Sequence, residues 1–166
     1  MCASKVPDAQ AACESASPLW PAFMAGANFV LHAAGRLEAE LVMSYEKFAM
    51  DAEQSSAFHV IGRGLQLDES GFAIDAFREV RPVSHFLGSA HTRRNFETVF
   101  FDFELSDNNL FEQWSQERSR DIVWRANQKW KAVLAAYRAP ILAPAKNEAQ
   151  LAFIAERKAS MPDMNY

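Results

Sequence analysis

The spacing of apolar residues predicts helices in the first part of the chain. Apolar side chains recur at helical intervals over Ala9–Phe23, where Pro18 and Pro21 would bend or divide a helix. A second amphipathic segment follows Ser44, a residue type suited to cap a helix N-terminus, and Gly64 supplies a stop. Two helices are therefore expected before residue 65.

Two short apolar runs predict strands between these helical segments and after them. Asn28–Leu31 lies before Gly35 and shows no polar alternation, which is typical of a strand buried on both faces. His85–Leu87 follows a shorter helix expected over residues 68–80 that Pro82 ends. Because strand, helix and strand alternate, the sequence predicts right-handed βαβ units with a parallel sheet, which is the α/β class.

The pattern changes after Asn95. An aromatic, extended stretch leads into Phe111–Tyr137, where apolar residues form one continuous stripe and predict a single long helix. Pro140 interrupts the chain, and a final helix is expected from about Lys146 to Lys158. The stripe is interpreted as a packing face, because its spacing suits burial against a neighbouring domain.

Composition narrows the classes of function. A chain of 166 residues, 49% of them hydrophobic, can bury one sizeable core, and its net charge of −4 gives no general attraction for nucleic acid or an anionic membrane. Two cysteines near the start do not form a disulfide framework, and no stretch approaches the roughly 20 apolar residues of a membrane span. We therefore expect a cytoplasmic protein that binds neither nucleic acid nor membrane.

Several segments resemble the trimethylamine methyltransferase family, in the same order as in that family. They are SKVPDAQAACESA, GANFVLHAAGRLEAEL, SYEKFAMDAEQ, HFLGSAHTRRNF, FEQWSQERSRDIVWRANQKWKAVLAAY and LAFIAERK. Together they cover nearly the whole chain and are similar to the C-terminal third of such proteins. Some members carry pyrrolysine in the segment that resembles SKVPDAQ, whereas this chain has ordinary residues there and is more similar to the branch without pyrrolysine.

The resemblance implies the fold and its division. It implies a TIM (β/α)8 barrel, which takes about 250 residues, so this chain would hold only a C-terminal fragment of one. Residues 1–100 would be the last βα units of the partial barrel, and residues 101–166 a helical C-terminal extension packing on it. The opening SKVPDAQ, which lacks a preceding strand or cap, is interpreted as a strand-end loop entered partway.

The resemblance also implies an activity: transfer of a methyl group from a tertiary or quaternary amine, of the trimethylamine or glycine betaine type, to the Co(I) of a corrinoid protein. Such chemistry belongs to methylamine metabolism and methanogenesis. No cofactor would be bound directly, because the corrinoid (cobalamin) is carried by the partner protein. A truncated chain would be inactive or would depend on a complementary N-terminal fragment, and a homo-oligomer is an alternative assembly.

Histidines at predicted strand ends are the first candidate site residues, because barrel enzymes place their active sites there. A neutral imidazole of His32 would hydrogen-bond a substrate carboxylate, or be satisfied by backbone inside a core. His85 could face a ligand from a loop, whereas His91 is more simply explained by capping of the next helix. The four scattered histidines show no metal-binding spacing, so no metal site is predicted.

Polar and aromatic residues near the same predicted loops complete the substrate-binding set. Asp8 and Gln10 would orient an amine, although Asp8 also has the type and place of a helix cap. Tyr45 could hold a quaternary ammonium through cation–π attraction or anchor the first turn of its helix. Arg36 stands where the family leads us to expect a large aromatic, which affects either local packing or the edge of the pocket.

No catalytic residue is predicted. A quaternary ammonium that loses a methyl group to Co(I) departs as a neutral amine, so the reaction needs positioning rather than a protein acid or base. The absence of a triad, paired carboxylates or a phosphate loop therefore does not oppose the family. The alternative from another class is a non-catalytic helical interaction module, in which Phe111–Tyr137 binds a partner.

Overall fold

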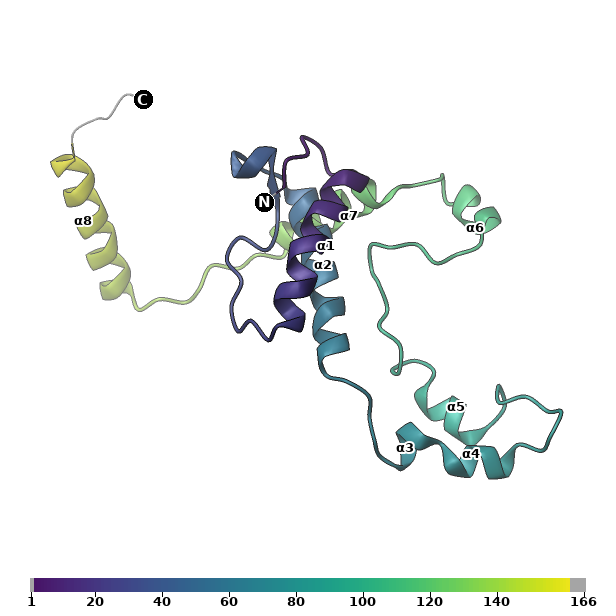
Figure 1. Cartoon of the computed structure of the whole chain (residues 1–166). Coiled ribbons are helices and arrows are strands. Elements are labelled where there is room, and N and C mark those ends of the chain that lie inside the picture. Colours follow the sequence, from purple (N-terminus) through teal and green to yellow (C-terminus); the bar gives the residue numbers. More distant parts are fainter. Residues whose placement is uncertain (1, 162–166) are drawn as a thin grey trace. The chain divides into compact units, whose positions relative to one another are not determined.

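The computed structural model describes residues 2–161, most of which are helical (Figure 1). The chain divides into two compact units, Met1–Val133 and Leu134–Tyr166. The described elements are α1 (Ala9–Met24), β1 (Arg36–Leu37), the 3₁₀ turn η1 (Glu38–Glu40), β2 (Val42–Met43), α2 (Tyr45–Gly62), α3 (Glu69–Phe72), α4 (Ile74–Glu79), α5 (Ala90–Asn95), α6 (Phe111–Gln116), α7 (Ile122–Ala135) and α8 (Pro144–Ser160).

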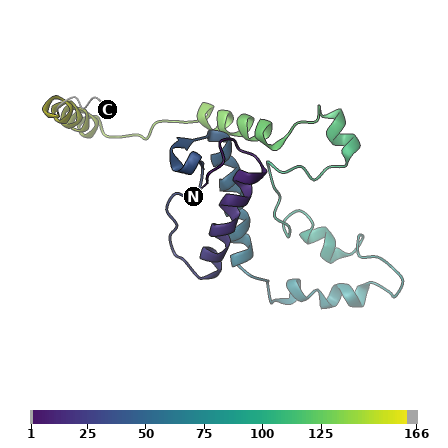
Figure 2. The ribbon, with the colours of Figure 1, turned by 45° about the horizontal axis from the view of Figure 1, so that its top comes forward.

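Helices α1 and α2 lie side by side, as Figures 1 and 2 both show. Trp20 and Phe23 of α1 meet Phe58 of α2, with ring centroids 5.1 Å and 6.1 Å from the Phe58 ring. Because such aromatic pairs add to the free energy of apolar burial, they hold the two helices together. The helix predicted over Ala9–Phe23 is confirmed, and the prolines inside it do not divide it.

Side chains at the N-termini of both helices begin them as the sequence predicts. The Asp8 carboxylate accepts a hydrogen bond from the Ala11 backbone N–H, and the Ser44 hydroxyl accepts one from the Lys47 N–H. These bonds satisfy backbone donors that a helix N-terminus leaves without partners. The capping role considered for Asp8 is confirmed.

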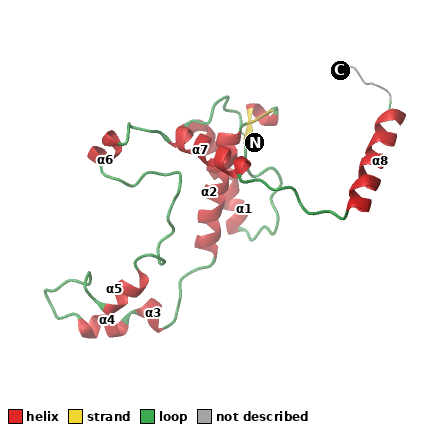
Figure 3. Ribbon diagram, turned by 180° about the vertical axis from the view of Figure 1, so that it is seen from behind, coloured by secondary structure: helices red, strands yellow, loops and turns green. Residues whose placement is uncertain are grey.

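The strands β1 and β2 (Figure 3) form a two-residue antiparallel pair. In this pair Arg36 is opposite Met43 and Leu37 is opposite Val42. Leu37 is buried in a small cluster with Cys2 and Ala11. The strand pair thus attaches the segment between α1 and α2 to the beginning of the chain.

The two strands predicted at Asn28–Leu31 and His85–Leu87 do not form. Both segments are loops and turns, and Phe29 and Leu31 are 78% and 69% exposed. A parallel strand takes its hydrogen bonds from neighbouring strands, and no such neighbour lies beside either segment within residues 2–161. The α/β barrel fragment stays a prediction.

The single helix predicted over Phe111–Tyr137 is wrong, because the chain breaks between α6 and α7. Arg118 and Ser119 have φ values of 72° and 49°, in the left-handed region that interrupts a right-handed helix. The Asp121 carboxylate then accepts a hydrogen bond from the Trp124 N–H at 2.7 Å and starts α7. Apolar residues keep a helical spacing on both sides of the break, and Arg118 stands on the stripe at the break itself, so the spacing did not indicate an interruption.

The helix expected over residues 68–80 is also divided. Asp68 caps α3 by accepting from the Gly71 N–H, and Ala73, with φ of 52°, separates α3 from α4. The ring of Phe77 in α4 meets the ring of Phe86, which follows α4, edge to face with centroids 5.2 Å apart. This segment is therefore a series of short helices instead of one element.

Helix α7 joins α2 through one carboxylate. Glu46 accepts hydrogen bonds from the Asn127 amide at 2.7 Å and from the Trp130 indole at 2.8 Å. These bonds hold the pKa of Glu46 at about 2, because they stabilise the ionised carboxylate. Residues that are 81 and 84 positions apart in the sequence are thus connected by a charged group.

The second unit contains α8. Pro144 opens this helix, where a proline fits because the first helical N–H has no intrahelical partner. The final helix predicted near Lys146–Lys158 is confirmed, and it extends to Ser160.

Candidate functional site

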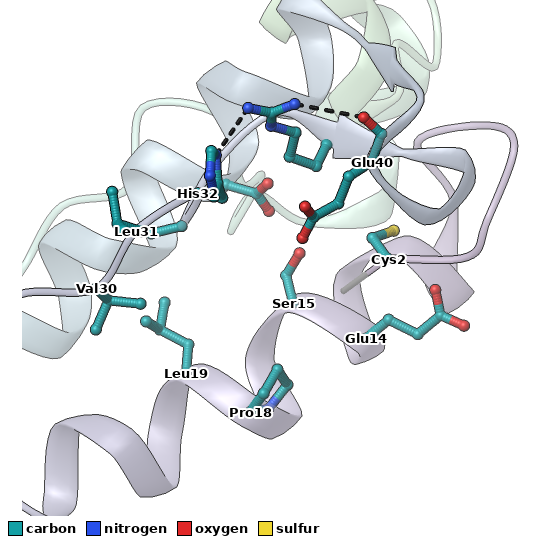
Figure 4. A pocket seen from close by; sticks show the side chains of 12 residues that line it. Cys2, Glu14, Ser15, Pro18, Leu19, Val30, Leu31, His32 and Glu40 are labelled. Carbon is teal, nitrogen blue, oxygen red and sulfur yellow. Dashed lines mark hydrogen bonds between the residues drawn. The ribbon is translucent and has the colours of Figure 1, made fainter.

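A small pocket lies beside α1, beneath the segment that connects α1 to β1 (Figure 4). Its volume is about 140 Å³. The lining residues come from the N-terminus, α1, the connecting segment, β1, η1 and α2: Cys2, Glu14, Ser15, Pro18, Leu19, Val30, Leu31, His32, Ala33, Arg36, Glu40 and Asp51. A cavity of this size suits a small molecule of roughly six to eight heavy atoms, since one of roughly 150 Å³ holds benzene.

Strained backbone surrounds this pocket. His32 and Glu40, which both line it, have φ values of 56° and 76°, and Glu38 and Ala39 are also in the left-handed region. Non-glycine residues enter this region at a cost in free energy, and they persist where surrounding contacts hold them. Strain of this kind clusters at ligand sites, so the segment from His32 to Glu40 is a candidate for a binding function.

A buried network of charged groups holds the segment that connects α1 to β1. Lys47 is fully buried, forms an ion pair with Asp51 one helical turn later, and donates to the Ser15 hydroxyl at 2.5 Å. The other Asp51 oxygen accepts the Gly35 N–H at 2.9 Å. Gly35 has φ of 83°, a conformation that glycine adopts without steric cost. The network therefore connects α1, α2 and the loop through groups that would be costly to leave unpaired.

His32 is oriented by Arg36. The Arg36 guanidinium lies 2.7 Å from the His32 Nδ1 atom and 3.3 Å from the Glu40 backbone oxygen (Figure 4). Because arginine only donates hydrogen bonds, the Nδ1 atom must accept, and the neutral imidazole carries its proton on Nε2. His32 is thus prepared to donate from Nε2.

Glu14 connects the pocket to the first residues of the chain. Its carboxylate accepts hydrogen bonds from the Gln10 amide and from the backbone N–H groups of Ala3 and Ser4. The Gln10 and Ser4 bonds are the main reasons why the pKa of Glu14 lies at about 2, so this carboxylate is ionised. Burial, in turn, raises the pKa of the Cys2 thiol, which favours its protonated form.

The structure brings only some of the predicted site residues together. His32 lines the pocket, and Gln10 reaches it indirectly through Glu14. Asp8 is engaged at the start of α1, where the Ala11 N–H holds its pKa below the usual range and Ser4 adds a further hydrogen bond. Arg36 lines the pocket, which supports the pocket-edge interpretation of this position.

The remaining candidates lie elsewhere. Tyr45 stacks on Trp130 with ring centroids 4.9 Å apart, in agreement with the anchoring role considered for it. His85 is exposed in the loop between α4 and α5. His91 does not cap α5: Ser89 does, while the His91 Nε2 atom is 2.7 Å from the Ser70 carbonyl oxygen and donates to it.

Sequence reasoning missed the Lys47–Asp51 pair and the Glu14 and Glu40 carboxylates. The signal for the first was present, because lysine and aspartate four residues apart face the same side of a helix. On most helices such a pair is solvated. Burial in this case depends on Ser15 and Gly35, which arrive from two other segments.

Residues 2–161 contain no group of side chains arranged as metal ligands and no helix suited to cross a membrane. No three His, Cys, Asp or Glu side chains converge there as metal ligands would. None of the helices formed by these residues is both long enough and apolar enough to pass through a bilayer.

Comparison with known proteins identifies relatives over most of the chain. Residues 1–162 match the family described as trimethylamine methyltransferase (MTTB). The chain is 41% identical to a glycine betaine methyltransferase of Desulfitobacterium hafniense (strain Y51), over 93% of the chain and 32% of the relative. It is 29% identical to the trimethylamine methyltransferase MttB of D. hafniense (strain DSM 10664 / DCB-2), over 92% of the chain and 30% of that relative.

A third relative is a proline betaine:corrinoid methyltransferase of Eubacterium limosum, which is 32% identical over 49% of the chain and 17% of the relative. The chain therefore spans about a third of the length of the first two relatives. The resemblance expected from the sequence segments is confirmed: this chain belongs to the trimethylamine methyltransferase family.

Proposed function

We propose that this chain provides the C-terminal part of a methyltransferase that moves a methyl group from a quaternary or tertiary amine to the Co(I) of a partner corrinoid protein. The support is the family itself, together with relatives whose names specify glycine betaine, trimethylamine and proline betaine. One of these names also specifies a corrinoid acceptor. The 41% identity to the glycine betaine enzyme favours a betaine substrate.

The chemistry assigns the protein a positioning role. When a strong nucleophile takes a methyl group from a quaternary nitrogen, the C–N bond breaks and its electron pair stays on nitrogen as a neutral amine. No proton need move to or from the protein, so the amine's orientation dominates. The pocket is suited to this, because His32 is held by Arg36 and the loop beneath it by Asp51.

The observation that carries the proposal within the structure is the pocket at His32. Of the five predicted substrate-binding residues, His32 is assigned a direct contact, and Gln10 and Asp8 hold α1 and Glu14 in place. Tyr45 and His85 would contact an amine only from outside this pocket. A barrel strand-end loop, as proposed for the family fold, would place such a pocket at the active face.

We propose further that the chain by itself is inactive and acts with the remainder of a barrel. Large apolar side chains beside the pocket are exposed, including Phe29 at 78% and Leu41 at 83%. Exposed apolar surface of this kind indicates a face that another part of the protein covers. The chain's share of the glycine betaine relative, 32%, leaves most of a barrel to that other part.

The test combines this chain with the complementary N-terminal two thirds of the D. hafniense glycine betaine methyltransferase by co-expression. Methylation of a reduced corrinoid protein by glycine betaine or trimethylamine is followed by visible absorption. We expect turnover by the combination and none by the chain alone.

Turnover by the purified chain alone would contradict the proposed dependence. No turnover by the combination, under conditions where the full-length relative is active, would contradict the methyltransferase function. The second result would favour the non-catalytic interaction module.

A further inference from the structure

The pocket is lined by groups of both charges. Arg36 supplies hydrogen-bond donors from β1 and His32 supplies one from the connecting segment, whereas Glu40 presents a carboxylate from η1, directed into the pocket (Figure 4). A purely cationic ligand would be repelled by the guanidinium and attracted by the carboxylate, so the two effects would oppose each other. A zwitterion would find a group of opposite charge for each of its own charges.

Arg36 and His32 have hydrogen-bond donors to spare. Arg36 has five N–H donors, and its hydrogen bonds within residues 2–161 go to two acceptors, the His32 ring and the Glu40 carbonyl oxygen. The His32 Nε2–H is a further donor, since Nδ1 accepts from Arg36. Guanidinium groups match the planar, two-oxygen geometry of a carboxylate.

Glu40 differs from the other acidic residues that line the pocket. Both Asp51 oxygens accept hydrogen bonds, from Lys47 and Gly35, and Glu14 accepts three. The Glu40 carboxylate has no hydrogen bond or ion pair with the described residues. Its negative charge is therefore available to a ligand.

From these observations we propose that Arg36 and Glu40 make the pocket specific for betaines, which are quaternary amines that also carry a carboxylate. Arg36 and His32 bind the carboxylate, and Glu40 faces the ammonium group. The volume of about 140 Å³ suits a molecule of the size of glycine betaine. This inference rests on the proposed function only in taking the pocket as the substrate site.

The test measures binding of three probes to the purified chain by ligand-observed NMR: glycine betaine, trimethylamine in its ammonium form, and acetate. The wild-type chain should bind glycine betaine at least roughly tenfold more tightly than either probe that carries one charge. Arg36→Met should weaken binding of glycine betaine by roughly tenfold or more while leaving trimethylamine unchanged or tighter. Arg36→Lys, which keeps the charge, should recover part of the loss.

Glu40→Gln tests the role of the Glu40 carboxylate. It keeps the hydrogen bonds of Arg36 to the His32 ring and to the backbone oxygen of residue 40. It should weaken the binding of both glycine betaine and trimethylamine, and it should leave the binding of acetate unchanged or make it tighter. The matched controls are Arg78→Met and Glu112→Gln, which remove one charge each at exposed positions away from the pocket. Neither control should alter the preference.

Several results would overturn the inference: equal binding of the three probes, no binding of glycine betaine, or a preference that survives both Arg36→Met and Glu40→Gln. These outcomes are separable from failure of the methyltransferase function. Methyl transfer that is indifferent to Arg36 would leave the function standing and remove the inference. A preference for glycine betaine that depends on Arg36 and Glu40, without methyl transfer, would leave the inference standing and remove the methyltransferase function.

Discussion

Two regions of the first unit have similar kinds of interaction in different surroundings. In the α1–α2 region, Lys47 and Asp51 form an ion pair that is almost completely buried. In the α3–α5 region, Arg78 and Asp75 form one whose side chains are 76% and 69% exposed. The buried pair also binds Ser15 and Gly35, whereas the exposed pair lies within α4 alone. The position of a charge pair, more than its chemistry, therefore determines what the pair can hold in place.

The largest expected difference in the free energy of unfolding comes from removing one partner of each ion pair. Lys47→Met should lower the free energy of unfolding by about 3 to 5 kcal/mol, because Asp51 would be left as a buried, uncompensated charge. Arg78→Met should cost less than about 1 kcal/mol, because water screens the exposed pair. Urea denaturation of both variants measures the two values.

A double variant tests the reason for the difference. Lys47→Met combined with Asp51→Leu removes both charges and should be more stable than Lys47→Met alone. A loss below about 1 kcal/mol for Lys47→Met, equal to that of Arg78→Met, would contradict the contrast between the regions.

Aromatic contacts should show the same contrast at a smaller scale. Phe58→Ala should cost about 2 kcal/mol, since Phe58 is partly buried between Trp20 and Phe23 and truncation leaves a cavity between α1 and α2. Phe77→Ala should cost about 0.5 to 1 kcal/mol, because Phe77 is 63% exposed and contacts one ring. Thermal unfolding followed by circular dichroism compares the two, and equal shifts would count against a better-packed α1–α2 region.

The sequence predicted the α1–α2 region better than the α3–α5 region, for a physical reason. Asp8 and Ser44 act locally on helices long enough for periodicity to be clear, so their bounds followed from nearby residues. In the other region, Ala73 takes a left-handed conformation that nothing in its residue type indicates. Short elements depend on contacts that one segment does not specify.

The residues of the candidate site were also predicted only in part. His32 was predicted from its place after an apolar run, and it lines the pocket although that run is not a strand. Glu14 and Glu40 were missed, because each is an ordinary polar residue until the fold places it beside the loop. Long-range convergence of this kind cannot be read from spacing along one chain.

Acid should loosen the contact of α7 with the better-packed region. The Glu46 pKa lies at about 2, mainly because of the Asn127 and Trp130 bonds, against an ordinary value of 4.5. A depressed pKa adds stability that is fully present above pH 4.5 and is lost as pH falls toward 2. The loss should be about 1.5 kcal/mol, since charged hydrogen bonds contribute at that scale.

Unfolding midpoints measured from pH 5 to pH 2 check this expectation. Glu46→Gln should remove part of the pH dependence in that interval, while Glu148→Gln on α8, which removes an exposed charge, should not. If Glu46→Gln and the wild type lose stability in parallel over the whole interval, Glu46 does not carry this stability.

The smallest effect is expected at the helix caps. Asp8→Ala should lower the free energy of unfolding by about 1 kcal/mol, because it leaves the Ala11 N–H without its acceptor at the start of a 16-residue helix. Asp68→Ala removes the same kind of cap from the four-residue α3 and should cost only about 0.3 kcal/mol, since few contacts depend on so short a helix. Urea denaturation of the two variants gives the comparison, with Asp8→Asn as a control that keeps a capping side chain. A greater loss for Asp68→Ala than for Asp8→Ala would reverse the order of stability assigned to the two regions, because it would show that α3 supports more structure than its own four residues.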